Sequence, residues 1–168
     1  MALLAAGCSD SPRDYESIAE LVANADNIKL YEGLPHQYAE AELLKQELAR
    51  KRTFTFGEFA FYAEPLPLSQ EDAAALTALF DADDTFSDDP PGRSKCGPYY
   101  PDYAVEWTKD DRVVRIQLCF GCNESKIYSG ESEFYLSLAD DAEKKLKALL
   151  KDRWQNRPKT KLAEMWRF

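Results

Sequence analysis

The chain has 168 residues, of which 45% are hydrophobic and 12% aromatic, and its formal net charge is −9. This length suits one domain with a packed core, and the composition is not that of a disordered chain. The acidic charge argues against binding to nucleic acid, and no apolar run is long enough for a membrane-spanning helix.

The chain opens with Met-Ala-Leu-Leu-Ala-Ala-Gly-Cys, and Ser-Asp-Ser-Pro-Arg follows. The run from Leu4 to Cys8 resembles the lipobox of bacterial lipoproteins, in which small residues precede a cysteine that is lipidated and becomes the mature N-terminus. Only seven residues precede Cys8, and none of them is Lys or Arg, so we expect the chain to begin inside a signal peptide. The resemblance implies a lipid on Cys8, a linker over residues 9–13, and a place in the bacterial cell envelope, on its periplasmic or extracellular face. A short apolar N-terminus on a cytoplasmic protein is the alternative.

Residues 14–157 are expected to form a single globular domain. In the second helix, Leu43, Leu44 and Leu48 are predicted to lie on one side. The predicted elements are a helix over 14–25, a strand over 28–31, a helix over 38–51, two strand pieces over 53–68 with a bend at Gly57, a helix after Ser69 that includes Leu76, Leu79 and Phe80, and an acidic loop over 81–95.

The second half of the domain is predicted to be a meander followed by a helix. Its clearest strand alternates Val114, Ile116, Leu118 and Phe120 with more polar neighbours, which is the pattern of a half-buried strand. The predicted elements are strands over 103–107, 113–120, 125–128 and 133–138, turns at Asp110-Asp111 and Gly130, and a helix from Asp140 to about Trp154, with Ser137 as its cap and Arg157-Pro158 at its end.

The order of these elements predicts the fold class. Strands follow one another, helices lie between and after them, and no strand–helix–strand alternation is present. We therefore expect an α+β fold with a mainly antiparallel sheet packed against three to four helices.

If Cys8 is lipidated, three cysteines remain: Cys96, Cys119 and Cys122. The interpretation we favour is one disulfide and one buried thiol. A zinc site is the first alternative, with His36, the only histidine, as the fourth ligand of a Cys₃His set; otherwise no cofactor is expected. Thiol redox chemistry is the second alternative, but the residues after Cys122 lack the helical period of redox-active Cys-x-x-C motifs.

The strand pattern also predicts where the cysteines lie. Cys119 lies on the more polar face of its predicted strand, opposite the apolar face, and stands near the end of that strand. We therefore expect the cysteine cluster at the end of the sheet rather than in its core. We expect Cys96 to come within disulfide range of Cys119 or Cys122, with Cα atoms roughly 4.4–6.8 Å apart.

Residues 158–168 form a basic tail with apolar side chains. From Lys151 onward six basic residues face two acidic ones, which makes this part +4 and the preceding 150 residues −13. The tail either folds back on the acidic body with Trp166 docked, or stays mobile and meets an anionic membrane surface. We expect a mobile tail that is dispensable for folding.

The body also resembles a group of uncharacterised bacterial proteins with a lone cysteine followed later by Cys-Phe-x-Cys. The resemblance rests on four stretches: residues 33–36, residues 61–62, Cys96-Gly97-Pro98-Tyr99 and Cys119-Phe120-Gly121-Cys122. It implies a shared structural role for the cysteines and no particular activity.

The sequence therefore predicts an exported, membrane-anchored lipoprotein with a non-catalytic binding or structural domain. Its partners would be the membrane, through the lipid anchor, and an envelope protein, and not nucleic acid. An enzyme is not the favoured interpretation, because the sequence has no Gly-rich phosphate loop, H-E-x-x-H or G-x-S-x-G motif. The alternative is a metal-binding or thiol-redox protein that uses Cys96, Cys119 and Cys122.

Overall fold

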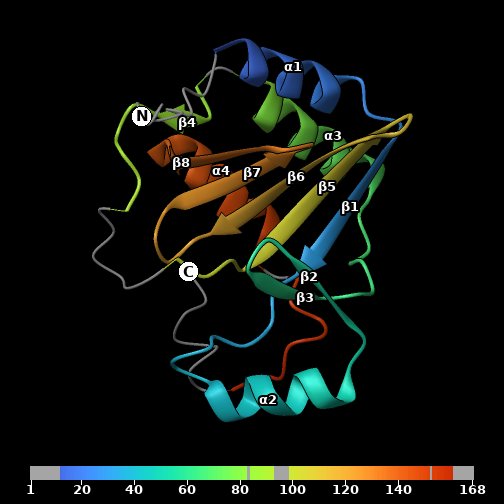
Figure 1. Cartoon of the computed structure of the whole chain (residues 1–168), viewed down its shortest axis with the longest axis vertical. Helices are drawn as coiled ribbons and strands as arrows, with labels where there is room; N and C mark the ends of the chain where they lie inside the picture. The colour runs from blue at the N-terminus through green and yellow to red at the C-terminus, as the bar shows by residue number, and fades with distance from the viewer. Residues whose placement is uncertain (1–11, 83, 93–98, 152, 161–168) are drawn as a thin grey trace, which may run out of the picture.

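The computed structural model describes residues 12–82, 84–92, 99–151 and 153–160. Within them the main element is an antiparallel sheet of six strands in the order β1-β5-β6-β7-β8-β4 (Figure 1). The strands are β1 (Asn27–Glu32), β4 (Phe86–Ser87), β5 (Tyr103–Lys109), β6 (Arg112–Cys119), β7 (Glu124–Ser129) and β8 (Ser132–Leu138). This sheet and its helices confirm the predicted α+β fold.

Strands β5 to β8 form the meander that the sequence predicts. Asp110 joins β5 to β6 with φ of 51°, and Gly130 joins β7 to β8 with φ of 58°. Both values lie in the left-handed region, which glycine and, among other residues, aspartate tolerate best. Strand β4 was not expected, because it lies inside the predicted acidic loop; it pairs with β8 through Phe86 and Leu138.

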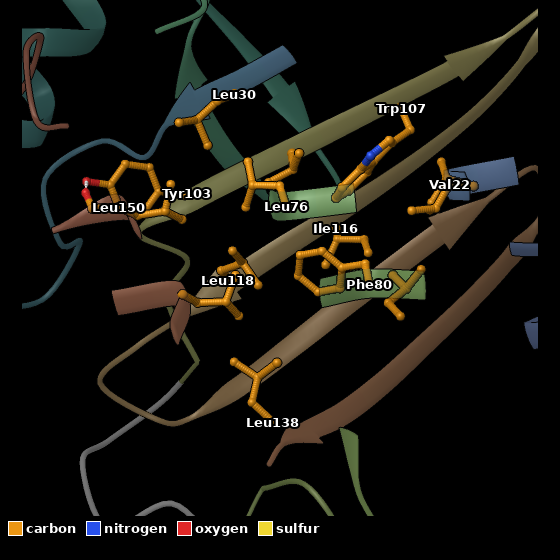
Figure 2. Packing of buried hydrophobic residues seen from close by; sticks show 14 of the residues in the cluster. Val22, Leu30, Leu76, Phe80, Tyr103, Trp107, Ile116, Leu118, Leu138 and Leu150 are labelled. Carbon is orange, nitrogen blue, oxygen red and sulfur yellow. Dashed lines mark hydrogen bonds between the residues drawn. The ribbon is translucent and has the colours of Figure 1, made fainter. Parts of the chain in front are cut away.

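Three helices cover one face of the sheet: α1 (Pro12–Ala23), α3 (Gln70–Asp81) and α4 (Asp140–Leu150). The apolar positions of β6 are fully buried on this face, as their alternation predicts. Trp107 of β5 packs edge-on against Phe80 of α3, with ring centroids 5.3 Å apart, and its indole N–H donates to Thr77. Figure 2 shows this packing; the labelled core residues are Val22, Leu30, Leu76, Phe80, Tyr103, Trp107, Ile116, Leu118, Leu138 and Leu150.

The opposite face of the sheet is covered in part by a hairpin of β2 (Thr53–Phe56) and β3 (Phe59–Tyr62). Phe56 and Phe61 of the hairpin form a small apolar cluster with Tyr31 and Ala104 of the sheet. The predicted bend at Gly57 is confirmed, because its φ is +57°.

Helix α2 (Ala41–Arg50) lies apart from the other helices, at the far end of the molecule from α1 (Figure 1). Leu43 and Leu44 are half-buried, Leu48 is 46% exposed, and the buried residue of α2 is Glu47. The Glu47 carboxylate accepts a hydrogen bond from the buried Tyr62 hydroxyl at 2.8 Å, so a polar contact fixes the orientation of this helix.

Helix α4 begins at Asp140, as predicted, but its cap residue differs from the predicted one and it ends earlier. Ala139, not Ser137, is its N-cap residue, and its last residue is Leu150 rather than Trp154. Leu146 and Leu150 are fully buried, as expected. Trp154 lies beyond the end of the helix, and its side chain packs in the main core.

Candidate functional site

Cys119 and Cys122 lie at the end of the sheet, as the strand pattern predicts. Strand β6 ends at Cys119, β7 begins at Glu124, and the turn between them closes with Asn123 at φ of 57°. We call residues 119–123 the cysteine turn. The two cysteines form a disulfide with Cα atoms 5.6 Å apart, and both side chains are buried. Cys96 lies outside the described residues, so its expected approach to this pair stays a prediction.

Hydrogen bonds hold the cysteine turn in place independently of the disulfide. The Phe120 N–H donates to the Asp102 carboxylate at 2.9 Å, which ties the turn to the start of β5. On the other side, Asn123 exchanges two hydrogen bonds with Leu138 at the end of β8, at 3.0 and 3.2 Å. The turn is therefore fixed to both neighbouring strands.

Asp102 is a perturbed carboxylic acid beside the disulfide. Burial raises the pKa of Asp102 from its ordinary 3.8 to about 6, because the charged form loses its water. The Phe120 N–H favours the charged form and offsets only part of this effect. The group therefore changes charge close to neutral pH.

An open groove of about 550 Å³ runs along the cysteine turn, and Cys122 forms part of its wall. Three carboxylates line it with Cys122: Asp89, Glu124 and Asp140 at the start of α4. We call this feature the cysteine groove. The negative charge of these side chains favours a basic ligand.

His36, the candidate fourth zinc ligand, lies in the loop before α2. Its Nδ1 accepts hydrogen bonds from the backbone N–H groups of Tyr38 and Ala39, at 3.2 and 3.4 Å, and its ring lies 4.6 Å from that of Tyr100. Burial and the charge of Arg157 hold the pKa of His36 below its ordinary 6.5. In the described part of the chain no three His, Cys, Asp or Glu side chains are grouped so as to hold a metal ion.

The structure contains a buried polar cluster that the sequence patterns do not predict. Glu40 and Arg157 form an ion pair with side chains 5% and 6% exposed. Burial by itself raises the pKa of Glu40, but the Arg157 guanidinium and the Thr160 hydroxyl hold it below its ordinary value. The fully buried Glu32 carboxylate accepts hydrogen bonds from the backbone N–H groups of residues 155–157 at 2.7–3.1 Å.

No local sequence pattern predicts this cluster. The two partners are 117 positions apart, and Arg157 stands next to a proline that suggests only the end of a helix. The one available signal is Trp154, whose ring lies 4.6 Å below the Arg157 guanidinium. A tryptophan three residues before an arginine is too common a spacing to predict a buried charge.

The described residues include no helix that is both long enough and apolar enough to cross a membrane. Cys8, the predicted lipidation site, and Trp166 of the predicted tail lie outside the described residues.

Comparison with known proteins gives one similar solved structure, described as "Putative Lipoprotein from Clostridium perfringens". It is 15% identical to this chain, with a TM-score of 0.41, over 79% of this chain and 87% of the other. A TM-score this low supports no argument about function. No protein-family model and no curated protein matches the chain.

Proposed function

We propose that this protein is exported, is anchored to a bacterial membrane by a lipid on Cys8, and carries a non-catalytic binding or structural domain of the cell envelope. The observation that carries this proposal is the run Leu-Ala-Ala-Gly-Cys at residues 4–8, followed by a polar segment. Small residues before the cysteine and a polar tether after it are the arrangement that the lipobox requires.

The Cys119–Cys122 disulfide supports export by a separate route. Disulfides persist in oxidising compartments such as the periplasm and the outer cell surface, and they are rare in the cytosol. This support comes from the folded domain and does not depend on the N-terminal segment.

The distance between Cys8 and the first helix limits where the domain works. Helix α1 begins at Pro12, and four residues span at most about 14 Å. A lipid on Cys8 would therefore hold the domain close to the bilayer surface, and a protein partner would have to reach it there.

Replacement of the lipidated residue tests this proposal. Cys8→Ser, expressed behind a complete lipoprotein signal peptide, should move the protein from the membrane to the soluble fraction, because acyl chains contribute about 0.8 kcal/mol per buried CH₂. Cys96→Ser is the matched control, since it removes a cysteine outside the lipobox-like run, and it should stay with the membrane. Membrane association that survives Cys8→Ser would overturn the proposal.

A second candidate function, thiol–disulfide exchange, rests on the place of Cys122 in the cysteine groove. A disulfide that closes a four-residue loop stabilises the fold by only about 2 kcal/mol, and hydrogen bonds already fix this turn. A stabilising role alone therefore explains the pair poorly.

In such an exchange a thiolate of a partner dithiol attacks Sγ of Cys122, and Cys119 leaves with the electron pair and takes up a proton. The second partner thiol loses its proton and attacks the mixed disulfide, which releases Cys122. The partner is oxidised by two electrons, and the two cysteines become thiols.

Differential alkylation before and after treatment with a dithiol, read by peptide mapping, tests the second candidate. Exchange predicts that Cys119 and Cys122 become alkylated together while the protein stays folded. Zinc added to the reduced protein tests the metal alternative in the same samples: bound zinc with protected thiols would favour the Cys₃His site. Cysteines that stay oxidised until the protein unfolds would overturn the exchange.

A further inference from the structure

Three consecutive basic residues, Arg50, Lys51 and Arg52, line one open groove of about 560 Å³, which we call the basic groove. Arg50 is the last residue of α2, Lys51 is its C-cap, and β2 begins at Thr53, so the chain changes from helix to strand across this run. Consecutive side chains of a regular helix or strand point in different directions. The change of backbone conformation brings all three side chains to the wall of the same groove.

The three cations have no carboxylate partner among the described residues. The eight ion pairs of the described residues each use a different lysine or arginine, and none of them involves Arg50, Lys51 or Arg52. The basic groove contains one carboxylate, Glu64, whose residue is exposed. The groove is therefore positively charged in a chain whose net charge is −9.

The remaining walls supply a hydrogen-bonding amide and apolar surface. The backbone N–H of Asn156 donates to Glu32, but its side-chain amide lines the groove and makes no hydrogen bond within the described part of the chain. Ala63 and Pro65 form an apolar side of the groove. Its volume lies within the range of about 300–1,000 Å³ that is typical of small-molecule sites. The groove can therefore receive an anionic group together with the organic group that carries it.

The charge of the basic groove matches a phosphate monoester better than a single carboxylate. A phosphate monoester carries a charge of about −1.5 to −2 at pH 7 and has three acceptor oxygens, whereas a carboxylate carries one charge on two oxygens. Guanidinium groups bind phosphate through two parallel hydrogen bonds, and the lysine ammonium binds it as a compact charge. Two arginines and one lysine, set against the Glu64 carboxylate, leave the charge that one such phosphate neutralises.

We propose that the basic groove binds a small molecule that carries a phosphate group. The side chains of Arg50, Lys51 and Arg52 surround the phosphate, and the organic part of the ligand lies against Ala63 and Pro65. This inference goes beyond the proposed function, since it holds whether or not Cys8 is lipidated, and its failure would leave the proposed export and anchoring intact.

The place of α2 in the fold favours a phosphate ester in solution over a lipid headgroup. Helix α2 lies at the end of the molecule opposite α1 (Figure 1), and α1 begins at Pro12, the described residue nearest in sequence to Cys8. A lipid on Cys8 would hold α1 near the bilayer, so the basic groove would lie at the end away from it.

Titration of the full, unlipidated chain with sn-glycerol 3-phosphate at constant ionic strength, followed by amide NMR, tests the site. Binding predicts saturable shifts at residues 50–52 and 63–64. Arg52→Gln should weaken binding by about tenfold or more, because hydrogen bonds to charged groups contribute about 1.5–3 kcal/mol. Lys45→Gln is the matched control, because Lys45 is exposed on α2 outside the groove and its replacement removes the same charge. It should leave binding unchanged.

Glu64→Gln gives a readout that damage to the fold cannot imitate. The substitution removes the one carboxylate of the basic groove, so it should tighten the binding of sn-glycerol 3-phosphate by about two- to fivefold. A variant that only destabilised the fold would bind more weakly. Unchanged or weaker binding by a folded Glu64→Gln would count against a phosphate in this groove.

Phosphatidylcholine vesicles with and without phosphatidylglycerol identify the source of the phosphate. If the unlipidated chain sediments only with the phosphatidylglycerol vesicles, and Arg52→Gln but not Lys45→Gln abolishes this, the site is supported and the phosphate belongs to a lipid headgroup. Two results would overturn the proposal. One is a set of shifts that never saturates or that sodium chloride reproduces, which would mean general screening. The other is binding of a glutamate-rich peptide without binding of sn-glycerol 3-phosphate, which would make an acidic protein the partner.

Discussion

Glu40 and Arg157 form an ion pair that is almost completely buried, although 117 positions separate them in the sequence. The pair joins the start of α2 to the segment that follows α4. Beside it the Glu32 carboxylate holds the backbone of residues 155–157. The segment after α4 is therefore fixed by carboxylates on two earlier parts of the chain, as well as by the packing of Trp154.

Arg157→Met tests the energetic weight of this pair. The substitution leaves the Glu40 carboxylate buried without its cation, and loss of one partner of a buried pair costs roughly 3–5 kcal/mol. We expect the free energy of unfolding in urea at pH 7 to fall by about that amount. Lys144→Met is the control, because Lys144 pairs with Asp141 on the surface, where solvent screens the pair, and should change stability little.

A double variant separates the pair from general packing. Glu40→Gln combined with Arg157→Met removes both charges, so it should be more stable than Arg157→Met alone. If Arg157→Met lost no more stability than Lys144→Met, the buried ion pair of Glu40 and Arg157 would not be important for stability.

The main sheet could be predicted from the sequence because the patterns that define its strands and turns lie within short stretches of the chain. The alternation of Val114, Ile116 and Leu118 identifies the buried face of β6, and the turn residues Asp110 and Gly130 set the meander. Strand β4 could not be predicted, because two residues in an acidic loop carry no period. Its pairing with β8 depends on a contact between segments about fifty residues apart.

His36 should make stability fall as the pH drops below neutral. Burial and the Arg157 charge hold the pKa of His36 below 6.5 in the folded protein, so the unfolded chain binds the proton more readily. The contribution of this residue is therefore fully present above pH 6.5 and is lost as the pH falls through the lower folded value. An NMR titration of the single histidine measures the folded pKa directly.

His36→Asn is the variant that checks this assignment. Its side-chain oxygen can accept the hydrogen bonds of Tyr38 and Ala39 but does not titrate, so urea midpoints between pH 5 and pH 7 should vary less than in the parent. A folded pKa at or above 6.5 would show the prediction to be wrong.

The titration of Asp102 should change stability with pH in the opposite direction to that of His36. Its pKa is raised to about 6, so the folded protein binds the proton more readily than the unfolded chain, whose value is near 3.8. Its contribution is present below pH 3.8 and is lost as the pH rises through 6. In Asp102→Asn the side-chain oxygen can still accept the hydrogen bond of the Phe120 N–H, but it does not titrate. Between pH 4 and pH 7 the free energy of unfolding of this variant should rise by about 2 kcal/mol relative to that of the parent. Parallel stability curves for the two proteins over this range would refute the shift.

The candidate site was only partly predictable. Periodicity placed Cys119 at the sheet end, and the odd cysteine count raised the question of pairing. The buried state of Glu47 and the contact of Asp102 with Phe120 could not be predicted, since both depend on where other strands and helices lie. Amphipathic patterns predict that apolar residues face the core. Helix α2 departs from this rule, because the buried residue on its inner side is Glu47, which accepts a hydrogen bond from the Tyr62 hydroxyl.

The mass of the N-terminal peptide of the mature protein, isolated from bacterial membranes, shows whether Cys8 is lipidated. We predict a chain that begins at Cys8, with acyl groups on this residue and with Cys119 and Cys122 recovered as a disulfide. A mature chain that retains Met1 and an unmodified Cys8 would contradict it.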